Sequence, residues 1–162
     1  MKHYLFIILS LLLALPLHAQ HEKDFASSFM ELNGEEHALS CVTVSPAMME
    51  RILQIPADSI ECDSLIPLLE QVKSVRIVSC QAPEEKVALL YEKAEVLALY
   101  HPLGYQKFGH DVDCTIYQRR RGDYIVEVVL ILQGGGKFSL IDLTGNMTDD
   151  IFARLTKGDV KE

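Results

Sequence analysis

Downstream of Gly104, apolar and polar residues alternate, and this period of two continues through four segments. Such alternation is typical of β-strands that bury one face. Turn-forming sequences rich in glycine and aspartate separate the segments, and consecutive strands joined by short turns pair antiparallel. The sequence therefore predicts a four-stranded antiparallel meander, with strands at residues 105–109, 114–119, 124–133 and 137–144.

The third segment, residues 124–133, is the most apolar of the four. Both alternating sets of its side chains are apolar, and only Glu127 interrupts the run. A strand that is apolar on both faces is typical of the middle of a sheet that is covered on both sides. We therefore expect this strand to be central and buried on both faces.

The segment between Pro83 and His101 has a helical period instead. Its apolar residues recur at intervals of three and four, which places them on one stripe of an amphipathic helix. The stripe consists of Val87, Leu90, Tyr91, Ala94, Leu97 and Ala98. Glu84 and Glu85 suit the positive N-terminal end of such a helix.

Further upstream, short helices and strands alternate. A short amphipathic helix from Phe25 is expected to close at Asn33-Gly34, and Ser45-Pro46 is a typical helix start. Strands are expected at residues 37–44 and 75–80, with Arg76 at an exposed edge, and short helical segments at 65–72 and 148–155. The predicted fold class is α+β: two layers, with a mixed or mostly antiparallel sheet, a C-terminal four-strand meander and helices packed on one face.

The first nineteen residues have the three-part pattern of a secretory signal peptide. Lys2 supplies the positive start, residues 5–15 form the apolar core, and Ala19 stands at a plausible cleavage point. A core of about 11 residues is too short to cross a membrane, which takes roughly 20. The expected location is the periplasm. No lipid anchor is expected, because the first cysteine of the chain is Cys41, far from the cleavage point. The expected divisions are a signal peptide at 1–19, an N-terminal segment with a short helix at 20–37, a single α+β domain at 38–158 and a tail at 159–162.

The charge balance narrows the classes of partner. Loss of Lys2 with the leader changes the net charge from −8 to −9. An acidic surface repels phosphate backbones and anionic lipid headgroups. We therefore expect no binding to nucleic acid or to a membrane surface, and a periplasmic protein as the partner. No segment after the leader is long enough to cross a membrane, so no membrane span is expected after cleavage. The sequence does not indicate an oligomeric state.

The chain has four cysteines and no closely spaced pair among them. In an oxidising compartment an even number permits two disulfides, and four cysteines allow three connectivities. Cys80 precedes the long helix, where the dipole would favour a thiolate, while Glu84 and Glu85 oppose it. Cys80 is therefore interpreted as an inert thiol or a disulfide partner of Cys41, with a reactive thiol as the alternative. The four are Cys41, Cys62, Cys80 and Cys114.

Histidine and aspartate gather near the start of the meander, at His101, His110, Asp111 and Asp113. Imidazole and carboxylate groups are suitable ligands for zinc and similar ions. Turns also attract aspartate for local hydrogen bonds, so a structural role is the alternative. The three arginines at 119–121 are interpreted as a solvated hairpin tip. No catalytic, cofactor-binding or metal-binding residue is therefore assigned from the sequence.

Four stretches carry a resemblance to a known family. They are Val42-Thr43-Val44-Ser45-Pro46-Ala47-Met48-Met49, Val75-Arg76-Ile77-Val78-Ser79, Gly104-Tyr105 and Leu140-Ile141-Asp142-Leu143-Thr144-Gly145-Asn146-Met147. On these residues the chain resembles domain-of-unknown-function family 4252, small exported bacterial proteins without an established activity. The resemblance implies no functional residues to carry over. The family's genes often lie near extracytoplasmic-function sigma factors, which implies envelope regulation by association.

The sequence supports one main functional hypothesis and two alternatives. The main hypothesis is a non-enzymatic periplasmic binding or interaction module, with an accessory role in envelope signalling. The alternatives are a thiol- or metal-dependent periplasmic enzyme, which would use Cys80 or the group at His101, and a structural component of the envelope. No cofactor is expected.

Overall fold

The computed structural model describes residues 22–54 and 69–150. Six strands form one sheet in the order β1-β2-β6-β5-β4-β3, and every neighbouring pair is antiparallel. The strands are β1 (Ser40–Val44), β2 (Val72–Gln81), β3 (Gln106–Asp111), β4 (Cys114–Arg121), β5 (Tyr124–Gly134) and β6 (Lys137–Met147). The described helices are α2 (Phe25–His37), α3 (Pro46–Leu53) and α5 (Glu84–Tyr100). The predicted α+β class and C-terminal meander are confirmed.

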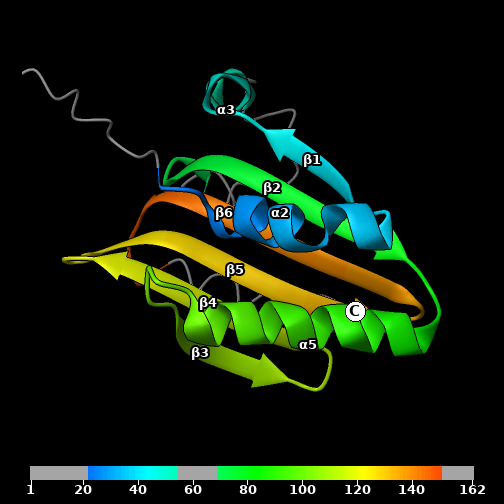
Figure 1. Ribbon diagram of the computed structural model, residues 1–162. Coiled ribbons are helices and arrows are strands. Elements are labelled where there is room, and N and C mark those ends of the chain that lie inside the picture. The colour runs from blue at the N-terminus through cyan, green and yellow to red at the C-terminus, as the bar shows by residue number, and fades with distance from the viewer. Residues whose placement is uncertain (1–21, 55–68, 151–162) are drawn as a thin grey trace, which may run out of the picture.

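Helices α2 and α5 lie on the same face of the sheet, as Figure 1 shows. Phe25 and Phe29 of α2 are buried in one cluster with Leu90 of α5 and Ile131 of β5. The α5 stripe predicted from the sequence faces this cluster, since its residues are buried except for the partly buried Leu97. The prediction of helices packed on one face of the sheet is confirmed for α2 and α5.

The opposite face of the central strands contributes to a second apolar cluster. Met49 of α3 is buried there with Val128 of β5 and Met147 of β6. The neighbouring residue Val129 belongs to the first cluster, so β5 is buried on both faces. The prediction for this strand is confirmed, and β5 and β6 are the two middle strands of the sheet.

Several boundaries differ from the prediction. Helix α2 does not close at Asn33-Gly34 but continues to His37, because the Asn33 side-chain amide donates to the Phe29 carbonyl one turn back (3.1 Å) and leaves the helix backbone intact. The helix ends at Ala38, whose φ of 49° turns the chain out of it, and β1 therefore starts at Ser40. Arg76 is not at an exposed edge, because β2 lies between β1 and β6.

Of the helical segment predicted at 65–72, residues 65–68 lie outside the described residues, and Val72 belongs to β2 instead. The segment predicted at 148–155 lies outside them from residue 151 on, as do the ends of the chain at 1–19 and 159–162. Among the helices in the described ranges, none is long and apolar enough to span a membrane.

Candidate functional site

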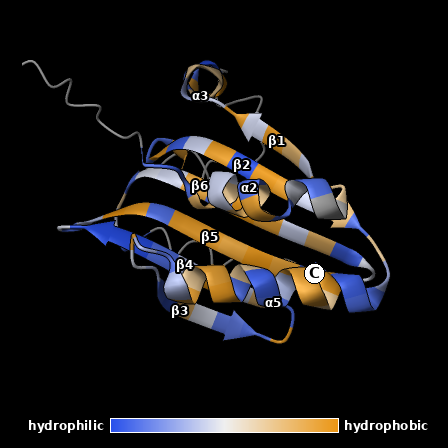
Figure 2. Cartoon of the chain, viewed as in Figure 1, coloured by the Kyte–Doolittle hydropathy of each residue, from blue (hydrophilic) through white to orange (hydrophobic). Residues whose placement is uncertain are grey.

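Along the face that carries α2 and α5, the sheet changes from apolar to polar. At the polar end, residues directly opposite one another on four neighbouring strands form a row, which runs Ser74, Thr144, Glu127, Arg119. The helices cover the apolar part of this face and leave the polar end open, at the left in Figure 1. Figure 2 shows the corresponding change along β4, which is hydrophilic at that end, while most of β5 is hydrophobic.

The N-terminus of α2 is held by carboxylates from three parts of the chain. Asp24 caps the helix by accepting a hydrogen bond from the Ser27 N–H (2.8 Å). The Phe25 N–H donates to Glu127 Oε1 (2.7 Å) and the Ala26 N–H donates to Asp142 Oδ2 (2.9 Å). These N–H groups have no partner within the helix, and negative charge is favourable at the positive end of its dipole. The sheet thus fixes where α2 begins.

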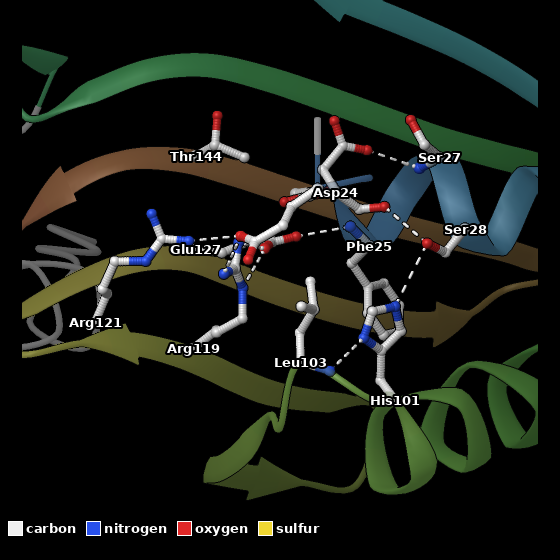
Figure 3. A network of polar contacts seen from close by, with 12 residues as sticks. Asp24, Phe25, Ser27, Ser28, His101, Leu103, Arg119, Arg121, Glu127 and Thr144 are labelled. Carbon is white, nitrogen blue, oxygen red and sulfur yellow. Dashed lines mark hydrogen bonds and ion pairs between the residues drawn. The ribbon is translucent and has the colours of Figure 1, made fainter. Parts of the chain in front are cut away.

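Arg119 lies beside this helix start, as Figure 3 shows. Its Nη2 is 2.8 Å from Glu127 Oε2, and its Nε donates to the same oxygen (2.9 Å). The Arg119 side chain is 12% exposed and that of Glu127 is fully buried. The ion pair and its hydrogen bond raise the pKa of Arg119, although burial opposes this. The interpretation of this arginine as part of a solvated turn is therefore wrong.

The other two arginines of the run also have partners. Arg121 Nη2 donates to Glu22 Oε2 (2.6 Å), and Arg119 Nη1 donates to the same oxygen (3.2 Å). Glu22 therefore bridges two arginines of β4, although its side chain is 43% exposed. Arg120 pairs instead with Asp149 (2.7 Å). Successive side chains of a strand point to opposite faces, which explains this division.

On the other side of the helix start, Arg76 of β2 pairs with Asp24 (3.3 Å) and donates to the Ser27 hydroxyl. Asp24 therefore has two roles, because one of its oxygens caps α2 and the other meets a guanidinium. Cationic side chains thus flank the helix start from both β2 and β4.

These groups surround a cleft of about 860 Å³ at the open polar end of the sheet face. We call it the cationic cleft, because Lys73, Arg76, Arg119 and Arg121 line it, whereas Glu22 and Asp24 are its lining carboxylates. The lining is completed by Pro46, Ser74, Val126, Thr144, Gly145 and Asn146. Gly145 permits a close approach of two backbones, since a Cβ there would lie 2.1 Å from the Gln71 carbonyl oxygen.

Asp142 lies beneath α2 with an unusual environment for a carboxyl group. It is 1% exposed, and its Oδ1 has no hydrogen-bond partner within the described structure. Burial, together with the negative charge of Glu127, raises the pKa of Asp142 well above its ordinary value. Burial likewise raises the pKa of the nearby Tyr105 hydroxyl. Asp142 therefore favours its neutral form more than an exposed aspartate does.

His101 lies apart from the other residues of the predicted metal group. Its Nδ1 accepts from the Leu103 N–H (3.3 Å), which leaves Nε2 to donate to the Ser28 hydroxyl (3.4 Å). Its ring packs against Tyr105 at 5.0 Å between centroids. Burial lowers the pKa of His101, with Arg119 contributing and Glu127 opposing. The lowered pKa favours the neutral imidazole, and the contacts of the ring with Ser28 and Tyr105 support the packing of α2.

His110 belongs to a hydrogen-bond network around the buried Thr115. The Thr115 hydroxyl lies 2.5 Å from the Tyr91 hydroxyl and 2.9 Å from His110 Nδ1, and it donates to Glu95 Oε1 (3.2 Å). One donor and two acceptor positions of a hydroxyl are thereby used. Thr115 is fully buried, whereas His110 is exposed and the Glu95 side chain is 26% exposed, so the network joins β3, β4 and α5 from the core to the surface.

The structure does not bring the predicted metal ligands together. Asp111 Oδ1 accepts from the Val112 N–H in its own turn (2.8 Å), and the Asp113 carbonyl accepts from Gln133. Within residues 22–54 and 69–150, no three His, Cys, Asp or Glu side chains are arranged to hold a metal ion.

Three cysteines fall in the described ranges, and all three are free thiols. Cys41 and Cys80 do lie on adjacent strands, as expected, but Cys41 is opposite Val78, so the two are offset by two residues. Burial, together with the charge of Asp111, raises the pKa of Cys114. Cys62 lies outside the described residues.

A second cavity, of about 460 Å³, is chemically different from the cationic cleft. It lies between α2 and α5, and its lining includes exposed apolar side chains such as Leu32, Val96 and Tyr100. The described residues thus form a charged cleft and, apart from it, an apolar cavity.

Comparison with known proteins shows the family of this chain. Residues 29–155 match the family DUF4252, a domain of unknown function. The chain belongs to the DUF4252 family. No curated protein matches it, and no solved structure matches it. The DUF4252 match includes the four cationic residues of the cleft and both buried carboxylates, whereas Glu22 and Asp24 precede it.

The residues that form this site in the DUF4252 chain match no catalytic or ligand-binding motif. Glu127 and Asp142 do carry a signal in the sequence, because each is the one acidic residue in its strand. An isolated charge in a buried strand needs a partner, since burying it unpaired is costly. Nothing in the sequence indicates that the partners are the backbone of α2 and the side chain of Arg119.

Proposed function

We propose that this protein is an exported, non-enzymatic binding module that takes an anionic group of a periplasmic partner in the cationic cleft. The observation that carries the proposal is the convergence of Lys73, Arg76, Arg119 and Arg121 on one cleft, in a chain whose net charge is −8. Charges of one sign gathered in a cleft raise the local concentration of ligands of the opposite sign. An accessory role in envelope signalling is part of the proposal.

The arrangement of Glu127 favours binding over catalysis. Its two oxygens are both engaged, one by the Phe25 N–H and the other by Arg119. A general base needs an oxygen within hydrogen-bond reach of the substrate proton. Glu127 instead orients Arg119 toward the cleft, which is the contribution expected of a supporting residue in a binding site.

The first prediction concerns the two exposed cations of the cleft. The double variant Lys73→Ala/Arg121→Ala should bind a tetraglutamate peptide at least about ten-fold more weakly than the wild type at low ionic strength, because it loses two favourable charges. Isothermal titration calorimetry measures the change. Affinity in both proteins should fall as salt is raised from about 0.01 to 0.15 M, because salt screens exposed charges.

The matched control removes the same charge elsewhere. Lys86→Ala/Lys137→Ala changes two lysines on α5 and at the start of β6, away from the lining of the cleft. It should retain wild-type affinity. Equal losses in both double variants would reduce the effect to net charge and contradict a specific site, as would absence of binding by the wild type.

A second prediction concerns export. Expressed in a Gram-negative host, the protein should be recovered from the periplasmic fraction with Gln20 as its first residue, since Ala19 ends the predicted leader. Intact-mass spectrometry of the purified protein measures this. Recovery of a chain that still begins at Met1, in the cytoplasm, would contradict the proposed location.

A further inference from the structure

The contact between Glu22 and the arginines of β4 bears on the class of ligand. This carboxylate comes from the segment that precedes the N-cap of α2, so it is not held by a helix or a strand of its own. Its Oε2 accepts from both Arg119 and Arg121 in the cationic cleft. The protein's own chain thus supplies an anion to the cleft.

The Glu22 contact is easier to break than the one beneath it. The Glu22 side chain is 43% exposed, and exposed ion pairs contribute little because water competes for both charges. Arg119 also binds the fully buried Glu127, so it would keep its orientation if Glu22 moved away. Departure of Glu22 would leave a preoriented guanidinium that faces the cleft.

A second cation of the cleft is available to a ligand. Asp24, two residues after Glu22, meets Arg76 of β2 and remains in place as the N-cap of α2. Lys73 also lines the cleft and has no ion pair with any other described residue. Lys73 can therefore meet a second carboxylate of a ligand whose first carboxylate meets the arginines of β4.

We infer that the ligand of the cationic cleft is an acidic peptide segment with more than one carboxylate, and that Glu22 is a tethered competitor for its arginine subsite. The inference rests on the proposed function, because it specifies the ligand of the same cleft. It makes the N-terminal segment a built-in regulator: the apparent affinity is reduced by the fraction of molecules in which Glu22 occupies the arginines.

The test uses Glu22→Gln and a labelled peptide that copies residues 20–24, acetylated and amidated so that only its side chains carry carboxylates. Glu22→Gln should bind this peptide about five-fold more tightly than the wild type, which is the gain expected when an exposed ion pair no longer competes. Fluorescence anisotropy measures both affinities. The control variant Glu92→Gln, on the exposed surface of α5, should bind as the wild type does.

The outcomes separate the two proposals. If wild type and Glu22→Gln bind the peptide equally, Glu22 is not a competitor and this inference is overturned, while the proposed function stands. If a peptide with glutamine and asparagine in place of the two acids binds as well, or if inorganic phosphate gains as much affinity as the peptide, the acidic-peptide class is wrong. If neither protein binds the peptide, tetraglutamate or phosphate, the proposed function fails as well.

Discussion

Replacement of Glu127 by alanine should lower the free energy of unfolding by about 3–5 kcal/mol, the usual cost of removing one partner of a buried ion pair. The change leaves the Arg119 guanidinium with only the half-exposed Glu22, and it leaves the buried Phe25 N–H without an acceptor. Small domains are stable by about 5–15 kcal/mol, so the loss is a large fraction of the total. Urea unfolding followed by circular dichroism measures it, because the chain has no tryptophan for fluorescence.

Two further variants define the mechanism of this loss. Glu127→Gln keeps an acceptor for the Phe25 N–H and loses only the charge, so it should be less destabilising than Glu127→Ala. Glu92→Ala removes an exposed carboxylate from α5 and should change stability by no more than about 0.5 kcal/mol. If Glu127→Ala lies within about 1 kcal/mol of the wild type, Glu127 does not hold the start of α2, and the account of the site as a preoriented arginine is wrong.

The elements that sequence reasoning identified are those whose signal is local. The stripe on α5 and the alternation in β4 to β6 each lie within a single segment, and burial of one face is enough to explain them. The end of α2 was harder, because Asn33-Gly34 is typical of a helix end and a helical turn tolerates both residues. The Asn33 amide bonds within its own helix, which a sequence alone does not reveal.

The site was beyond prediction because its contacts are remote in sequence. Glu127 meets the Phe25 N–H 102 residues away, and Asp142 meets the Ala26 N–H 116 residues away. The interpretation of the three arginines as one solvated hairpin tip fails because a strand divides their side chains between two faces. Because alternate side chains of a strand lie on the same face, Arg119 and Arg121 are expected on one face and Arg120 on the other. The structure shows this division, since Arg119 and Arg121 bind Glu22 and Arg120 binds Asp149.

Under the proposed function, this arrangement links the stability of the protein to ligand binding. Glu127 accepts from the helix with one oxygen and from Arg119 with the other, and Arg119 reaches from there into the cationic cleft. The residue that fixes α2 is therefore the residue that orients the arginine. A variant that weakens the helix start should also weaken ligand binding, even where it leaves every residue of the cleft lining in place.

Asp142 should make the protein less stable as the pH rises above about 4, the ordinary pKa of an aspartate. Its pKa is raised in the folded state by burial first and by the charge of Glu127 second, with Asp24 adding to this and the Ala26 N–H and Arg76 opposing it. The folded state therefore holds its proton at pH values at which the unfolded state has released it. The contribution of Asp142 to the free energy of unfolding is fully present below its pKa in the unfolded state. It is lost as the pH rises toward and through the raised pKa in the folded state, by up to about 1.4 kcal/mol per pH unit.

Asp142→Asn isolates this contribution, because an amide keeps an acceptor for the Ala26 N–H and cannot titrate. Relative to the wild type, the variant should gain stability as the pH rises from about 4 toward the raised pKa of Asp142, as measured by urea unfolding at each pH. Asp149→Asn is the matched control, since the hydrogen bond and charge of Arg120 lower the pKa of Asp149, whose contribution is lost only as the pH falls below about 4. Its difference from the wild type should be constant over the same range. Parallel curves for the wild type and Asp142→Asn would show that Asp142 is charged in the folded state throughout, and that the carboxyl groups beneath α2 do not share their environment as described.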